Sequence, residues 1–186
     1  MIEFSQLETE RLKIRRFKPS DLEPFVAYRS SLEVSAFQGL FSLERGRNLI
    51  AEMHEKPLGD PGWFQFALEE KSSGEMSGDL IGDLALNLIE LPRTAELGFT
   101  LAPAHWGNGY ALEAVSGLLE IAFNTLGLHR IIAFTADDNH RSQKLLGRLG
   151  FRLEGKSIES YQVNGVWINE FSYALLEREW RAITAA

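Results

Sequence analysis

The stretch that most constrains the fold is residues 95–114, in which a strand pattern runs into a glycine-bearing loop and then into a helix pattern. Polar and apolar residues alternate over residues 96–101, which is the period of a strand, and Pro103 stops further strand pairing. Gly107 and Gly109 can adopt positive φ without steric cost, so the amides of this loop can point into one concavity. The sequence therefore predicts a strand, an amide-lined loop and a helix in direct succession.

The helix is predicted over residues 111–126, because apolar residues recur there at three- and four-residue spacing. A helix start carries unpaired N–H groups and about half a positive charge, and both favour an anion such as a diphosphate. Glycines before a helix also occur for geometry alone. Taken by itself, the stretch leaves open both an anion site and a purely structural turn.

The composition is that of an ordinary folded protein, since 45% of the 186 residues are hydrophobic and 24% are charged. The length suits one domain with a sizeable core. No run approaches the roughly 18 apolar residues of a membrane span. The first residues show no secretory signal, so we expect a cytoplasmic protein with no membrane partner.

The residue types also restrict the chemistry. The absence of cysteine excludes disulfides, thiolate metal sites and a cysteine nucleophile. The four histidines are scattered without the spacing of a metal site, so no metal is expected. A net charge of −7 argues against nucleic acid as a partner and mildly favours a cationic substrate.

Strand patterns are spread over most of the chain. They lie at residues 12–17, 64–68, 80–89, 95–101, 130–135 and from 151 onward, with a hairpin at Asn164 and Gly165 between residues 160–163 and 166–175. Turns at residues 72–79 and 91–93 are expected to make residues 64–101 a three-stranded meander. The first strand is expected at a sheet edge or with one wet face, because Lys13, Arg15 and Arg16 interrupt it.

Helix patterns interrupt the strands. Besides residues 111–126, they cover residues 20–29, 42–56 and 139–149. Ser20 fits a capping box, Ser42 fits a simple N-cap, and Gly150 fits a C-cap after the last of these helices. The final residues, 175–186, are predicted to form a short helical tail.

Many short matches then occur in a fixed order. They are Thr9, Glu10, Arg11, Leu12, Ile14 and Arg15; Leu80, Ile81 and Gly82; Glu96, Leu97, Gly98 and Phe99; Trp106, Gly107, Asn108, Gly109, Tyr110, Ala111, Glu113 and Ala114; His129 and Arg130; Asp138, Asn139 and Ser142; Leu149, Gly150, Phe151, Glu154 and Gly155; Asn164, Gly165, Val166 and Trp167; and Glu179 and Trp180. Over essentially the whole chain, this set resembles the GNAT superfamily of acyl-CoA N-acyltransferases. The likeness is closest to its RimJ/RimL-type branch.

The resemblance implies an α/β (α+β) fold, with a single domain over residues 1–186. It implies a bent, mostly antiparallel mixed sheet of about seven strands, flanked by about four helices. The fourth and fifth strands, residues 95–101 and 130–135, are expected to splay apart and to hold acetyl-CoA in the gap.

The resemblance also assigns cofactor-binding residues. The backbones of Phe99 and Leu101 are expected to pair with the amide-rich pantetheine arm, and Asn139 to hydrogen-bond it, although Asn139 also fits a helix cap. The pyrophosphate is expected on the loop, at His105, Trp106, Gly107, Asn108, Gly109, Tyr110 and Ala111. Arg141, Lys144 and Arg148 are either contacts of the 3′-phosphate or a solvated helix face.

Two departures from the family pattern affect the site. Ala104 stands where relatives usually have Gln or Arg, three residues before the first glycine. Leu146 stands where many relatives have the tyrosine that protonates the leaving thiolate. Ser142, one helical turn after Asn139, is our candidate for that proton donor, and an ordinary helix-surface serine is the alternative.

An amine acceptor must lose a proton before it attacks a thioester, because its pKa is about 8 for an α-amine and about 10.4 for a lysine. Glu96 is our candidate base, acting through water; the alternatives are an exposed strand glutamate or an ion pair with Arg130. Tyr161 and Glu159, on the predicted hairpin, are lesser candidates.

These observations favour an acetyl-CoA-dependent N-acetyltransferase that acts by direct attack of an amine, such as a protein N-terminus or a small-molecule amine. Direct attack is favoured because the chain has no cysteine and no serine in a recognisable nucleophile motif. The alternative is a non-catalytic acyl-CoA sensor with the same fold. The sequence decides neither the acceptor nor the oligomeric state, and it is compatible with a homodimer.

Overall fold

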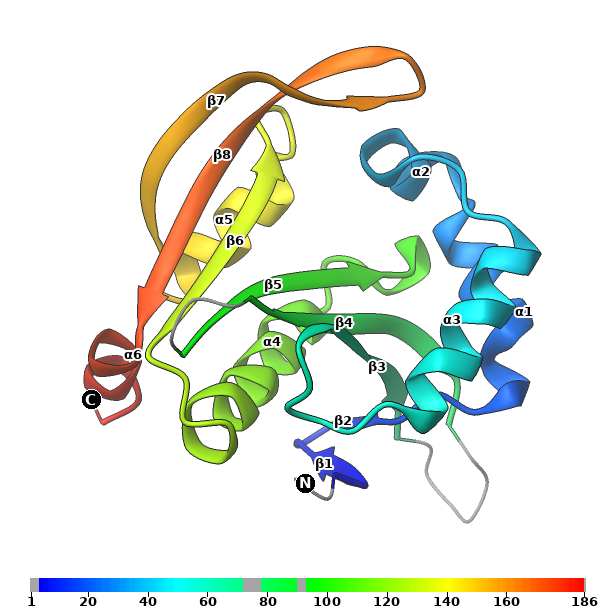
Figure 1. Ribbon diagram of the computed structural model, residues 1–186, viewed down its shortest axis with the longest axis horizontal. Helices are drawn as coiled ribbons and strands as arrows, with labels where there is room; N and C mark the ends of the chain where they lie inside the picture. The colour runs from blue at the N-terminus through cyan, green and yellow to red at the C-terminus, as the bar shows by residue number, and fades with distance from the viewer. Residues whose placement is uncertain (1–3, 72–77, 90–92, 186) are drawn as a thin grey trace.

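The computed structural model describes residues 4–71, 78–89 and 93–185, and within these ranges eight strands form one sheet. The strand order is β1-β2-β3-β4-β5-β6-β8-β7, and every neighbouring pair is antiparallel except β5 and β6, which are parallel. The chain therefore has the mixed, mostly antiparallel α/β architecture that the sequence predicted (Figure 1).

The strands and helices follow the predicted order closely. The strands are β1 (Gln6–Glu8), β2 (Leu12–Arg15), β3 (Gly62–Glu70), β4 (Leu80–Leu88), β5 (Thr94–Leu101), β6 (Arg130–Ala136), β7 (Arg152–Val163) and β8 (Val166–Leu176). The α-helices are α1 (Leu22–Arg29), α2 (Leu32–Gln38), α3 (Leu43–Glu55), α4 (Tyr110–Glu120), α5 (His140–Arg148) and α6 (Glu177–Thr184). A π-helical segment, Ile121–Thr125, continues α4, so the predicted helix over residues 111–126 is irregular in its last turn.

The two faces of the sheet pack against different helices (Figure 1). Leu97 and Ile131 belong to the larger core cluster, which includes Val115 and Leu118 of α4. A smaller cluster lies under α1 and α3 on the opposite face, where Phe25 contacts the rings of Phe17, Tyr28 and Phe41 and the cluster includes Ala67 of β3. Fully burying a side chain of this size contributes about 1.5–3 kcal/mol. Side chains alternate between the two faces along a strand, so Leu97 of β5 faces α4, whereas its neighbours Glu96 and Gly98 lie on the opposite face of the sheet.

Three local predictions are confirmed. The Ser42 hydroxyl accepts from the Arg45 amide at 3.1 Å and begins α3. The Asn139 side chain accepts from the Ser142 amide at 3.2 Å and begins α5. The hairpin turn has positive φ at both central residues, 50° at Asn164 and 83° at Gly165, as its two-residue loop requires.

The capping box predicted at Ser20 is wrong. Residues Pro19–Asp21 form a short 3₁₀ turn, and α1 begins at Leu22 without a side-chain cap. The Asp21 carboxylate instead accepts from the Lys18 amide at 2.7 Å and pairs with Arg15 at 2.7 Å. The ion pair with Arg15 outcompetes the local cap.

The expectation that the first strand is an edge strand or has a wet face is also wrong. The strand β2 lies between β1 and β3, and Arg15 is buried. Its guanidinium pairs with Asp21 and, at 2.5 Å, with Glu69 of β3. Burial acts to lower the pKa of Arg15, but the hydrogen bonds that its guanidinium donates to both carboxylates outweigh burial and raise it. An arginine can therefore occupy an interior strand position here.

Other elements go beyond the prediction. The short strand β1 and the helix α2 carry no clear periodic signal, and Ser31 caps α2 by accepting from the Val34 amide. The predicted tail is the regular helix α6, and its Trp180 is buried with its ring 5.2 Å from that of Phe123. The predicted turns at residues 72–79 and 91–93 lie largely outside the described residues.

Candidate active site

The strands β5 and β6 separate partway along their length. Their parallel pairing runs from Thr94 opposite Arg130 to Leu97 opposite Ala133. Beyond this point β5 continues to pair with β4 on one side, while β6 continues to pair with β8 on the other. Figure 1 shows the two strands diverging toward their carboxyl ends. The predicted splay is therefore present, and it begins at Gly98.

The loop after β5 has the conformation that its glycines indicated. Gly107 and Gly109 both have φ of 81°, a left-handed backbone conformation that is sterically unfavourable for residues with a Cβ atom. Gly109 directly precedes α4, whose first turn begins at Tyr110. The first four amides of a helix have no intrahelical partner, so this end of α4 presents donors and positive charge toward the splay.

A polar clamp, made of Thr9, Arg11 and Glu113, holds this loop against the amino-terminal strands. The Glu113 carboxylate accepts from the Thr9 hydroxyl at 2.5 Å and from both the amide and Nε of Arg11 at 2.7 Å. Burial acts to raise the pKa of Glu113, but these hydrogen bonds outweigh it and lower the pKa. The carboxylate is thus held ionised in the first turn of α4.

The clamp reaches the loop itself through Arg11. Its guanidinium donates to the Asn108 carbonyl at 2.9 Å and stacks over the Tyr110 ring at 4.4 Å. The Tyr110 hydroxyl donates to Glu70 of β3, and this hydrogen bond raises the pKa of Tyr110. The clamp gives a physical role to the Thr9 and Arg11 matches, which are about a hundred positions from Glu113 and showed no such role in the sequence.

A cavity of about 400 Å³ lies along this loop and beside the carboxyl end of β5, with residues of α2, α4 and α5 around it. It is lined by most of the residues that the resemblance assigned to the cofactor: Phe99, Leu101, His105, Trp106, Gly107, Gly109, Tyr110, Ala111, Asn139 and Ser142. Asn108 does not line it, and its carbonyl is held by Arg11. Residues from β5, the loop, α4 and α5 thus meet at one cavity, which we call the slot.

Some backbone groups of the predicted site are already engaged. The amides of His105 and Trp106 donate within the turn, to Ala102 and Pro103. The Leu101 carbonyl accepts from the Trp106 indole at 2.7 Å. Donors for an anion are therefore expected from Gly107 onward, with His105 and Trp106 offering their side chains to the slot.

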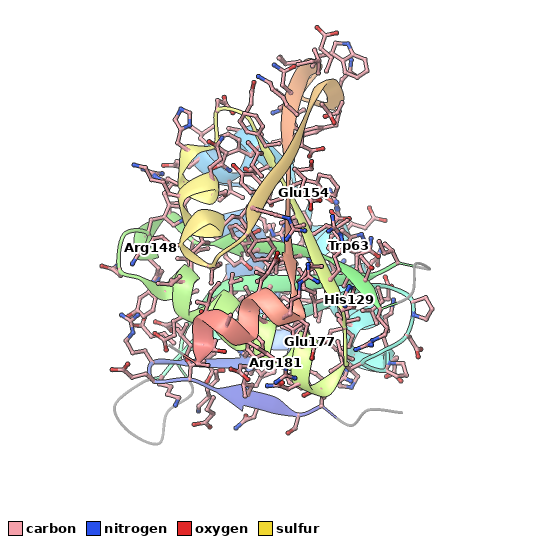
Figure 2. The ribbon with its side chains drawn as sticks, turned by 90° about the vertical axis from the view of Figure 1, so that its left-hand side faces the viewer. Trp63, His129, Arg148, Glu154, Glu177 and Arg181 are labelled. Atoms are coloured by element: carbon pink, nitrogen blue, oxygen red, sulfur yellow. The ribbon has the colours of Figure 1, made fainter. Side chains whose placement is uncertain are left out.

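The three basic residues near α5 all line the slot. The Arg141 guanidinium stacks over the Trp106 ring at 4.4 Å, which joins α5 to the loop. Lys144 lies one turn further along the same helix, and Arg148 lies at its end, where Figure 2 shows it on the outside of the molecule. The positive charge needed to hold a phosphate is thus available beside the loop.

Glu96 does not line the slot. It alternates with Leu97, so it lies on the sheet face that carries Gly98 and Thr100, and its register partner on β4 is Asn87. Burial raises the pKa of Glu96, and a hydrogen bond with Asn87 partly opposes this. Glu96 and Ser142 therefore flank the splay from opposite faces of the sheet.

The alternative in which Glu96 pairs with Arg130 is wrong. Arg130 pairs with Glu154 of β7 instead (Figure 2 labels Glu154). In the described part of the chain, Glu96 has no cationic partner within ion-pair distance. A half-buried carboxylate with a raised pKa and no counter-ion is suited to accept a proton.

The structure adds Glu170 of β8 to this region. Burial and the nearby charge of Glu96 raise its pKa, while a hydrogen bond with Ser160 opposes them. Tyr161 of β7 is half-buried, and burial followed by the charge of Glu170 raises its pKa. Glu159 has φ of 48°, and its amide donates to Asn169. Sequence reasoning proposed Tyr161 and Glu159 but missed Glu170, which has no local signal.

The described residues contain neither a metal-binding cluster nor a membrane-spanning helix. No group of three or more His, Asp or Glu side chains there is placed to hold a metal ion. No helix there is long and apolar enough to cross a membrane.

Comparison with known proteins gives a consistent result. A family model described as "Acetyltransferase (GNAT) domain" matches residues 11–152. The uncharacterized N-acetyltransferase YoaA of Bacillus subtilis is 31% identical over 181 residues, which cover 94% of this chain and 98% of the relative. The crystal structure of a GNAT-family acetyltransferase from Bacillus anthracis superposes with a TM-score of 0.80 at 30% identity, covering 94% of this chain and 99% of that one.

A third likeness is one of fold alone, because the identity is 22%. It is to the spermidine N-acetyltransferase of Vibrio cholerae in complex with CoA and spermine, with a TM-score of 0.79 over 93% of this chain and 99% of that one. All three proteins are named as acetyltransferases.

Proposed function

Since this chain belongs to the GNAT family of acetyltransferases, in its RimJ/RimL-like branch, we propose that it transfers an acetyl group from acetyl-CoA to a primary amine by direct attack. The observation that carries the proposal is the splay that opens into the amide-lined slot. A cofactor that is long, amide-rich and phosphorylated at one end matches that shape and its distribution of donors.

The slot offers a complementary group for each part of acetyl-CoA. Gly107–Ala111 amides at the start of α4 suit the pyrophosphate, because both the donors and the helix dipole favour an anion. Arg141 and Lys144 supply positive charge for a further phosphate. The unpaired edge of β5 at Phe99 suits the amides of pantetheine, as a strand edge suits any extended peptide-like chain.

In the proposed mechanism, Glu96 accepts the proton that the acceptor ammonium must lose, through a bridging water. Burial has raised its pKa, which brings it closer to that of the amine and to neutral pH, where a general base works best. Acetyl-CoA supplies the thioester, and the nitrogen attacks its carbonyl carbon while the carbon–sulfur bond breaks. A backbone amide of β5 at the splay is suited to hold the developing oxyanion.

Ser142 is proposed as the proton donor to the leaving thiolate. It lines the slot, and its backbone amide is held by the Asn139 cap in the first turn of α5. Leu146, which replaces the usual tyrosine, is fully buried one turn further along and has no proton to give. The ammonium loses two protons as it becomes an amide: Glu96 takes the first before attack, and the second, released from the nitrogen of the tetrahedral intermediate, returns to Ser142 after its hydroxyl has protonated the thiolate.

The acceptor remains open among primary amines. The fold is shared with a protein solved with CoA and spermine, which supports a small cationic amine. The acidic net charge of −7 is favourable for such a substrate as well.

Calorimetric titration with acetyl-CoA, ATP and NAD tests the proposal. We expect saturable binding of acetyl-CoA and much weaker binding of the two nucleotides, which lack the pantetheine arm that fits between β5 and β6. Binding of ATP or NAD without a response to acetyl-CoA would rule the proposal out. Binding of acetyl-CoA without turnover of any amine would favour a non-catalytic sensor.

A further inference from the structure

The helix α2 forms a side of the slot that the family resemblance did not assign to the cofactor. Glu33, Val34, Phe37 and Gln38 line the slot, and their spacing places them on one face of the helix. Figure 1 shows α2 beside the carboxyl end of β5 and next to the tip of the β7–β8 hairpin. The slot therefore has β5 on one side and α2 on another.

The apolar part of this helix face is not accounted for by packing of the fold. Val34 is buried and Phe37 is partly buried, yet neither belongs to either core cluster of the described chain. The lining that β5 contributes, Phe99 and Leu101, is apolar as well. A cavity with apolar linings on two elements favours a ligand that has an apolar body.

Gln38 fastens the end of α2 to β5. Its Nε2 donates to the Thr100 hydroxyl at 3.0 Å, and its Oε1 accepts from Arg29 at 2.6 Å. Because a guanidinium can only donate, Arg29 fixes the orientation of the amide, with its oxygen toward Arg29 and its NH₂ group toward Thr100. We call these two hydrogen bonds of Gln38 the latch. A helix of seven residues is not stable by itself, so its position depends on such contacts.

Both ends of the latch are anchored on buried groups of the sheet. Thr100 is buried on β5, and Arg29 pairs with the buried Asp83 of β4, which also accepts from the Tyr28 hydroxyl at 2.7 Å. Burial acts to lower the pKa of Arg29, but the charge of Asp83 and the hydrogen bonds to it outweigh burial and raise the pKa. Arg29 thus stays charged, and α2 is held to two strands of the sheet at once.

We propose that α2 is a second wall of the cofactor slot, in which Val34 and Phe37 contact the apolar side of the pantetheine arm and Gln38 is a positioning residue that holds α2 next to β5. The inference rests on the proposed function, because it takes the slot to hold acetyl-CoA. Pantetheine carries a gem-dimethyl group and several methylene groups besides its two amides. The amides pair with the edge of β5, and the carbon groups lie against α2.

The test compares acetyl-CoA with adenosine 3′-phosphate 5′-diphosphate, which is CoA without its pantetheine arm. Phe37→Ala should raise the Kd of acetyl-CoA about five- to tenfold, because the contact of an aromatic side chain with the ligand is lost. The Kd of the truncated nucleotide should change by less than about twofold, since that ligand ends at the phosphates.

Both Kd values are measured without any amine, because Gln38 and Thr100 also line a neighbouring cavity of about 950 Å³. Calorimetry gives the Kd of acetyl-CoA. Competition against acetyl-CoA gives that of the truncated nucleotide, so that weak binding is still quantified.

Leu32→Ala is the matched control for Phe37→Ala. Leu32 lies on the same helix, is 85% exposed and does not line the slot. Each variant puts an alanine into α2 in place of a large apolar residue. Leu32→Ala should leave both Kd values at those of the wild type.

Two substitutions of Thr100 test the latch from the side of β5. Valine has the shape of threonine without the hydroxyl that accepts from Gln38, whereas serine keeps that hydroxyl. Thr100→Val, like Gln38→Ala, should raise the KM for acetyl-CoA about three- to tenfold and change kcat by less than about twofold, because one hydrogen bond that positions α2 is lost. Thr100→Ser should keep the KM of the wild type.

The outcomes separate the inference from the proposed function. Absence of acetyl-CoA binding to the wild type overturns both. An unchanged Kd of acetyl-CoA in Phe37→Ala, an equal rise for the truncated nucleotide, or an equal rise in Leu32→Ala overturns the inference alone. A lower Tm of Gln38→Ala with an unchanged KM for acetyl-CoA assigns the latch to folding and overturns the role of Gln38 as a positioning residue.

Discussion

Replacing Gly107 by alanine separates the strain of the loop from its role in binding. Gly107 has φ of 81°, and a Cβ built there meets no atom within 4 Å. The cost of Gly107→Ala to folding is therefore that of a left-handed backbone alone, about 1–2 kcal/mol. For a chain of this length, this lowers Tm by about 2–8 °C.

Gly165 provides a matched control at the far end of the molecule. Its φ is 83°, and a Cβ there also meets nothing within 4 Å, but it lies in the β7–β8 hairpin and not in the slot. Gly165→Ala should therefore lower Tm by a similar amount. The two variants differ only in whether the added methyl group faces the slot.

The affinity for acetyl-CoA should then fall in one variant only. A methyl group at Gly107 displaces the anion from at least one amide, and a hydrogen bond to a charged group contributes about 1.5–3 kcal/mol. The Kd should rise by about 10- to 100-fold in Gly107→Ala, and stay at the wild-type value in Gly165→Ala. Differential scanning calorimetry and isothermal titration measure both quantities. Equal Kd values in the two variants would refute the assignment of the loop to the phosphates.

Three further substitutions test single residues of the site. Glu96→Gln should lower kcat and remove the acid limb of the pH profile, and a kcat within twofold of the wild type would exclude Glu96 as the base. Because burial raises the folded pKa of Glu96, its ionised form destabilises the fold at pH values above the unfolded pKa of about 4.3. Glu96→Gln should therefore have a higher Tm than the wild type at neutral pH, and this gain should disappear as the pH falls toward that value. Glu113→Gln should weaken acetyl-CoA binding and lower Tm at neutral pH. The stability that the lowered pKa of Glu113 provides is present above its unfolded pKa and is lost as the pH falls through its folded pKa. Equal Tm values of variant and wild type at neutral pH would contradict the clamp. Ser142→Ala should slow thiol release while Tm stays constant, because the Asn139 cap uses the backbone amide of residue 142; unchanged turnover would leave Ser142 as an ordinary helix serine.

Short-range features of the fold could be predicted from the sequence because their causes are local. Gly107 and Gly109 indicated positive φ, Asn164–Gly165 indicated a tight hairpin, and Ser42 indicated a cap, and each acts within a few residues. The order of these local elements, together with the resemblance, was enough to predict the splay. The slot then followed from the topology.

Features that depend on distant residues could not be predicted. Arg15 looked like an exposed strand residue until Asp21 and Glu69 were seen to neutralise it. The match at Thr9 and Arg11 had no explanation until Glu113 lay beside it. Both cases involve pairing across the chain, and the sequence pattern of either partner alone does not indicate it.

The acceptor side was the least predictable part of the site. Glu96 could be proposed from its position on a strand, but Glu170 had no distinguishing neighbours in the sequence. The interest of Glu170 comes from a repulsive interaction with Glu96, because neither carboxylate has an ion-pair partner in the part of the chain that the structure describes. Such features are visible only once the whole surroundings of a side chain are known.

The most direct test of the account is thiol release from acetyl-CoA in the presence of a panel of primary amines: N-terminal peptides, polyamines, amino acids, aminoglycosides and ω-amino amides. The account predicts that at least one amine gives saturable release of free thiol, with an equal amount of N-acetylated product by mass spectrometry. Tight binding of acetyl-CoA with no thiol release above the rate without amine would contradict it, and would leave the chain as a sensor that keeps the fold and the slot but not the reaction.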